Sequence, residues 1–152
     1  MRDLGNNLVS AQALASVVLA GNNATTNGTA IDLKGFNGAY VNVNTGVEGV
    51  TLAANLSISF VLQHSDDNTT YTNAVAKDVT DSAIGTTDGV WLMLDANAET
   101  PQTSSIGYIG GKRYVRCNIV FLGNHTTGTA MSIDVIKGYA LHSEGASTVT
   151  VR

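Results

Sequence analysis

The 152-residue chain has few charges: Asp, Glu, Lys and Arg make up 13 % of it, against about 25 % in an average protein. Eight Lys and Arg against twelve Asp and Glu give a net charge of −4, which excludes the basic surface that nucleic acid binding needs. No stretch reaches the roughly 20 apolar residues of a membrane-spanning helix, so we expect no membrane partner, and the length suits one domain.

The first 20 residues are expected to form an N-terminal arm outside the main domain, which would span residues 21–152. Leu4, Leu8, Ala11, Ala15 and Val18 fall at helix-like spacing, so a short helix and an extended segment lying on a neighbour both remain open. Ser10, Gln12 and Ser16 interrupt the apolar run, which argues against a signal peptide and favours a soluble product made in the cytoplasm.

Residues 21–29 are predicted to form a polar loop of Asn, Thr and Gly, and from Ala30 the pattern predicts β-strands. Residues 31–33 form a short strand, and 39–45 alternate with Val41 and Val43 on one face and Tyr40, Asn42 and Asn44 on the other. In the next strand, Leu56, Ile58, Phe60 and Leu62 recur at every second residue. Residues 90–94 are almost continuously apolar, which is typical of a strand buried on both faces.

The C-terminal third shows the same alternation. One strand places Val115, Cys117, Ile119 and Phe121 on a single face, and the next places Met131, Ile133 and Val135 inward. Gly138 is a candidate for a β-bulge, and residues 147–151 for a last short strand or a tail. Short strands between turns, without amphipathic helices, predict a single-domain, jelly-roll-like antiparallel β-sandwich.

The cluster His64-Ser65-Asp66-Asp67 contains the residue types of a hydrolase. Adjacent strand residues point to opposite faces, so His64 and Ser65 would not meet, and no Gly-x-Ser-x-Gly motif is present. We interpret the segment as a turn in which Asp66, Asp67 and Asn68 bind backbone N–H groups. A loop-bound cation is the weaker alternative.

Other reactive residue types are dispersed, so we predict no enzyme, metal or cofactor. Cys117 lies in an apolar run and is expected to be buried, and His64, His125 and His142 lack metal-ligand spacing. Gly110-Gly111 predicts a tight turn that leaves Lys112 and Arg113 beside acidic neighbours. Trp91, Tyr71 and Tyr108 are predicted core or strand-pair residues, with a sugar-binding platform as the alternative.

These segments, taken in order, resemble small head accessory proteins of tailed phages and gene-transfer agents. The resemblance spans most of the chain, and it is carried by Met1-Arg2-Asp3-Leu4, Ile31-Asp32-Leu33-Lys34-Gly35-Phe36, residues 64–71, residues 108–116 and Lys137-Gly138. The middle and end are also similar to discoidin-type jelly rolls, although Asn68 stands where Gly is usual in their turn. Asn tolerates the left-handed conformation, so the turn can still form.

The resemblance implies a virion structural protein without enzymatic activity, bound to the capsid exterior as a decoration (cement) protein or spike base. Its partners would be the major capsid protein, further copies of itself, with a trimer favoured, and a spike or fibre protein. Leu4, Leu8, Leu14 and Val18 are the candidate interface residues, because the apolar arm has no evident place in the sandwich. A carbohydrate-binding adhesion module of a virion is the alternative function.

Overall fold

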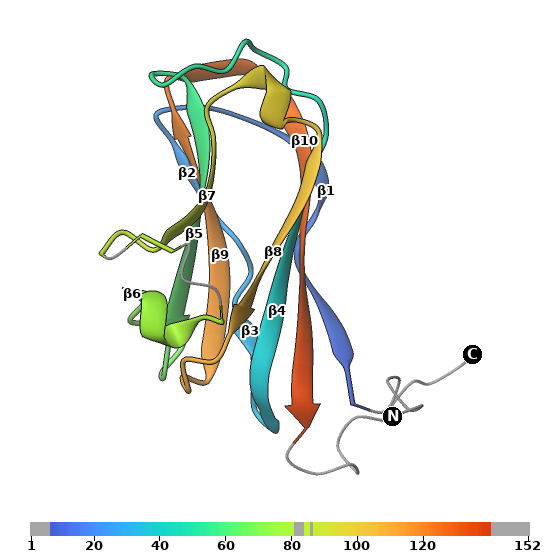
Figure 1. Ribbon diagram of the computed structural model, residues 1–152, viewed down its shortest axis with the longest axis vertical. Helices are drawn as coiled ribbons and strands as arrows, with labels where there is room; N and C mark the ends of the chain where they lie inside the picture. The colour runs from blue at the N-terminus through green and yellow to red at the C-terminus, as the bar shows by residue number, and fades with distance from the viewer. Residues whose placement is uncertain (1–6, 81–83, 86, 141–152) are drawn as a thin grey trace, which may run out of the picture.

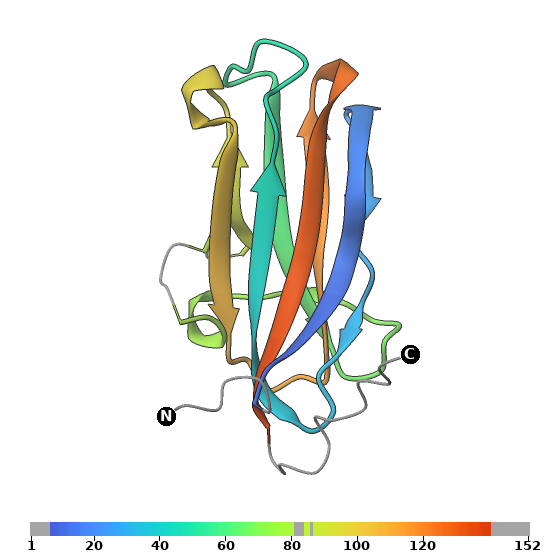
Figure 2. The same ribbon diagram turned by 90° about the vertical axis from the view of Figure 1, so that its right-hand side faces the viewer.

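The computed structural model describes residues 7–80, 84–85 and 87–140, which form two packed antiparallel sheets (Figure 1). Sheet A has the order β1-β10-β4-β8. Figure 2 shows these four strands side by side. Their bounds are Val9–Asn22 for β1, Phe36–Thr45 for β4, Gln102–Tyr108 for β8 and Asn124–Ala140 for β10.

Sheet B has the order β2-β9-β5-β6, with β3 also pairing with β9 and β7 also pairing with β5. Single-turn 3-10 helices at Ala76–Asp78 and Asn97–Glu99 lie in the connections. The bounds of the strands are Thr25–Asn27 for β2, Ile31–Asp32 for β3, Ser57–Ser65 for β5, Thr72–Asn73 for β6, Val90–Leu94 for β7 and Tyr114–Leu122 for β9.

The strand pairing is that of a jelly roll. The chain pairs from its ends inward: β1 with β10, β2 and β3 with β9, β4 with β8, and β5 with β6 and β7. The pairs β10–β4 and β9–β5 then join these hairpin-like pairs into two sheets. All of these pairs are antiparallel, and this nested order defines the jelly-roll connectivity, so the predicted fold class is confirmed.

The core lies between the sheets, as the alternation of apolar residues predicted. Val41 and Val43 of β4 and Ile133 and Val135 of β10 are fully buried, as predicted from their alternation. Opposite them, sheet B contributes fully buried residues from β5 and β9, which are Ile58, Phe60, Leu62, Val115, Cys117 and Ile119. The two inner faces therefore supply a continuous apolar layer.

The structure corrects the predicted arm. Val9–Asn22 is a full strand of sheet A, hydrogen-bonded along β10, and Ala13 is buried in the core. Neither a helix nor a separate segment is present over these residues. The register along β10 shifts three times, between Gln12 and Leu14, Leu14 and Val17, and Leu19 and Gly21. Each shift breaks the two-residue period, which is why the sequence did not read as a strand.

Three smaller predictions were also wrong. Gly138 pairs in register with Gly38 and does not form a bulge. The strand Val90–Leu94 is only partly buried, with Met93 51 % exposed, because β7 pairs with β5 alone. The segment 21–29, predicted as a loop, includes the end of β1 and β2. The predicted strand at 147–151 lies outside the described residues.

In the part of the chain that the structure describes, no helix has the length and apolar character to cross a membrane.

Candidate docking surface

On the outer face of sheet A, residues that are paired across neighbouring strands form rows, and these rows contain a single charged side chain. Buried and outward residues alternate along the strands, and the register aligns the outward ones. The rows are Ser10–Ile136–Tyr40–Gly107, then Gln12–Asp134–Asn42–Ser105, then Ser132–Asn44–Thr103. Asp134 is the single charge in these rows, and it has no hydrogen-bond or ion-pair partner among the described residues. The face is otherwise composed of small polar and apolar groups.

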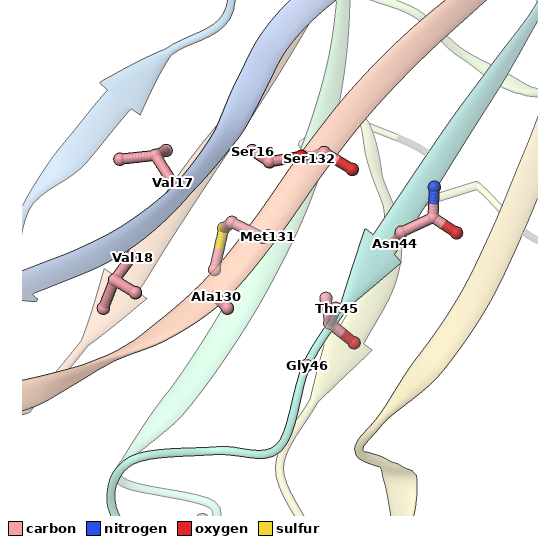
Figure 3. Close-up of a pocket in the computed structure, with 9 residues that line it drawn as sticks. All are labelled: Ser16, Val17, Val18, Asn44, Thr45, Gly46, Ala130, Met131 and Ser132. Carbon is pink, nitrogen blue, oxygen red and sulfur yellow. The ribbon is translucent and has the colours of Figure 1, made fainter.

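One end of this face contains a shallow hollow beside β1, here called the Val18 groove. Its volume is about 390 Å³. Val18 is 61 % exposed and Val17 is 40 % exposed. Figure 3 shows that the lining residues come from the neighbouring strands β1, β10 and β4 and from Gly46 just after β4, with Ser132 and Asn44 on the side away from Val18. The groove therefore combines exposed valines with neutral polar groups.

The opposite end contains an apolar hollow, here called the Gly138 groove, of about 430 Å³. Leu8, Tyr40 and Ile109 line it and are 41 %, 48 % and 51 % exposed. The Tyr40 hydroxyl accepts a hydrogen bond from Ser105 Oγ at 2.6 Å, which fixes the ring at the edge of the groove. Exposed apolar side chains gathered in this way mark an interaction surface.

The four predicted interface residues do not form one site. Leu8 lines the Gly138 groove and Val18 the Val18 groove, at opposite ends of sheet A. Leu14 is partly buried and packs against the core, so it supports the sandwich itself. Leu4 lies outside the described residues.

Sequence reasoning missed Tyr40, Ile109 and Ile136 as surface residues. The alternation places Tyr40 on the face opposite to Val41 and Val43, and that was the available signal. A large apolar residue at an outward position among Asn, Ser and Thr suggests a contact rather than a core. Tyr40 lies on β4 and Ile136 on β10. The two residues are neighbours because these strands pair, and this pairing is not evident from local sequence.

The segment 64–71 is the predicted turn. Asp67 Oδ1 accepts hydrogen bonds from the backbone N–H groups of Thr69 and Thr70, at 2.9 and 2.8 Å, and these bonds hold the pKa of its carboxyl well below the usual range. Ser65 Oγ donates to the same oxygen at 2.8 Å. Asn68 has φ of 60°, the left-handed conformation expected of it. The Ser65 hydroxyl is therefore part of the turn.

His64 turns away from Ser65. Its buried ring lies with Nδ1 2.9 Å from the Tyr108 hydroxyl, which also accepts a hydrogen bond from the Lys112 backbone N–H. Burial lowers the pKa of His64 below 6.5, and burial raises the pKa of Tyr108 to about 12. Both groups are thus neutral near pH 7, and they join β5 to the β8–β9 turn.

That turn has the expected ion pairs. Gly111 has φ of +71°, Lys112 pairs with Asp66 at 3.2 Å, and Arg113 binds Asp32 in bidentate fashion at 3.0 and 2.7 Å. The Arg113 hydrogen bond is the main cause that lowers the pKa of Asp32 to about 2. These charges lie where β9 begins, so they lie away from the rows of the sheet A face.

Cys117 and the aromatic residues are involved in packing. Cys117 is fully buried, as predicted, and burial raises the pKa of its thiol to about 12. Trp91 packs beside Phe60 with ring centroids 6.5 Å apart. The Arg116 guanidinium lies over the Tyr71 ring, with its Cζ atom 3.8 Å from the centroid of that ring. The sugar-binding platform remains a prediction.

The described residues include no group of three or more His, Cys, Asp or Glu placed to hold a metal ion. His125 is buried beside Phe121 with Nε2 3.0 Å from the Leu122 carbonyl oxygen. It lies in a different part of the chain from His64, and His142 lies outside the described residues.

Comparison with known proteins shows no matching family model and no matching curated protein. Among solved structures, one similar chain comes from Bacillus endospore appendages, described as a novel family of disulfide-linked pili. It has a TM-score of 0.42 and 13 % identity, and the match covers 90 % of each chain. A likeness at this level carries no argument about the function of the present chain.

Proposed function

We propose that this chain is a structural protein of a virion, without enzymatic activity, that binds the capsid exterior through the outer face of sheet A. The sequence resemblance to phage head accessory proteins supports the choice of partner. The charge-poor face between the two grooves supports the choice of surface, and it is the observation on which the proposal depends.

The physical basis is the low cost of desolvating this face. A charge buried at an interface loses hydration that a partner must replace in good geometry, whereas neutral polar and apolar groups lose much less. The Asn, Ser and Thr side chains of the rows can exchange hydrogen bonds with a partner, and exposed Val17 and Val18 add apolar area. Asp134 then favours a partner with one cationic group facing the middle of the sheet.

As a decoration protein, the chain would stabilise the shell by adding interface area across capsid subunits, since binding to the assembled state alone shifts the equilibrium toward it. We propose that it does so as a homo-oligomer, with a trimer favoured, and that a spike or fibre protein is a further partner.

The proposal is tested by co-sedimentation of purified variants with empty capsids of the same particle. Val18 is exposed and Ser132 is partly exposed on the sheet A face, so Val18→Arg and Ser132→Arg each place a cation there. We expect each to weaken binding about thirtyfold or more, the loss typical of an interface hot spot.

Met93→Arg is the matched control, because Met93 is 51 % exposed on β7 of sheet B. It should bind like the original protein, and all three variants should keep the same thermal midpoint. Equal binding by the sheet A variants, or loss in Met93→Arg alone, would place the contact elsewhere and refute the proposal.

A further inference from the structure

The floor of the Gly138 groove is a pair of glycines directly opposite each other, Gly38 on β4 and Gly138 on β10. Neither has a positive φ, so the backbone conformation does not require glycine at either position. A glycine inside a strand costs conformational entropy and gives up side-chain packing. Both glycines are buried, and a Cβ at Gly138 would lie 3.3 Å from Leu8 Cδ2, so the missing side chain lets Leu8 lie close to the sheet.

The walls of the groove are apolar. Leu8 stands on the β1 side, Tyr40 and Ile136 form the next cross-strand row, and Ile109 closes the β8 side. Three of these four side chains are more than 40 % exposed, so they have room for further apolar contacts. The volume of about 430 Å³ is enough for a few aliphatic side chains.

The chain supplies a segment that fits this groove. β10 ends at Ala140, two residues beyond the glycine floor, and residues 141–152 follow. They contain turn-forming residues around Gly145 and then the alternating run Thr148-Val149-Thr150-Val151. In an extended conformation Val149 and Val151 share one face, about 7 Å apart, with the threonines on the other.

We propose that residues 141–152 fold back and place Val149 and Val151 of the same chain in the Gly138 groove. Returning from Ala140 to the level of Ile136 covers about 13 Å along β10, and residues 141–148 can span about 26 Å. The tether also keeps the segment at a millimolar effective concentration, which favours docking within one chain over docking on a second copy. This inference does not depend on the proposed virion function.

Cysteine cross-linking in the full-length protein tests the docking. Ile109→Cys is combined with Val149→Cys in one variant and with Thr150→Cys in another. Ile109 is 51 % exposed, so its replacement should be tolerated, and the native Cys117 is buried and will not compete. The two variants have tethers of almost equal length but place the second thiol on opposite faces of the segment.

We expect a disulfide within one chain to form about tenfold faster for Val149→Cys than for Thr150→Cys, because only the former would face the groove. Equal rates would show that the segment meets Ile109 by random encounter, and would overturn the inference. Disulfide-linked dimers as the main product would overturn it too, since they would identify a second copy as the occupant. A mass measurement under non-reducing conditions separates these products.

Discussion

At the scale of single residues, neutral buried groups and small turn motifs hold the β5 and β8–β9 ends of the sandwich together. His64 and Tyr108 meet in the interior, and Asp67 fixes the adjoining turn through backbone N–H groups. The sequence predicted the turn because Ser, Asp and Asn in series bind local backbone. It could not predict the His64–Tyr108 contact, since it joins residues 44 positions apart through strand pairing.

The burial of His64 predicts a pH dependence of stability. Its folded pKa is lowered below 6.5 by burial, while in the unfolded chain it stays near 6.5. Below pH 6.5 the unfolded chain therefore binds a proton more readily, and stability falls until the pH reaches the folded pKa. Above pH 6.5 the ring is neutral in both states and has no such effect.

We therefore expect the free energy of unfolding to fall between pH 7.5 and pH 5.5, and to fall less in His64→Gln. Urea unfolding at both values measures this, and the comparison uses the difference within each protein, so a general destabilisation by the substitution cancels. An identical pH-dependent loss in both proteins would show that His64 is not the group responsible.

At the scale of elements, β1 is the long strand that could not be predicted from the sequence. Strands β4, β5, β9 and β10 were predictable because their inward residues keep a two-residue period. In β1, the register shifts around Ala13 and Ala15-Ser16 interrupt that period. The apolar residues of β1 then fall at intervals that resemble those of a helix.

The placement of β1 in sheet A predicts that the sandwich depends on this strand. Removal of residues 1–22 exposes the edge of β10 and removes Ala13 from the core, so the product should be unfolded or aggregated. Circular dichroism and thermal unfolding measure the outcome. A folded, soluble product lacking residues 1–22 would mean that β1 is not needed for the sandwich.

At the scale of the whole molecule, charge is distributed unevenly over the two sheets. The ion pairs Lys112–Asp66 and Arg113–Asp32 and the Arg116–Tyr71 contact involve β9 or the turn before it, whereas the rows of the sheet A face contain Asp134 alone. The low charge content was evident from composition. The placement of the charged residues away from one face was not evident from composition, because it depends on the jelly-roll order that makes β1, β10, β4 and β8 neighbours.

The central proposal is that this protein binds a capsid exterior. Its most direct test is the mass of the purified full-length protein in solution, by analytical ultracentrifugation, with and without empty capsids of the same particle. We predict a small oligomer, with a trimer favoured, that moves into the capsid fraction at a fixed ratio to the capsid subunits. A protein that sediments at the same mass whether or not capsids are present would contradict the claim.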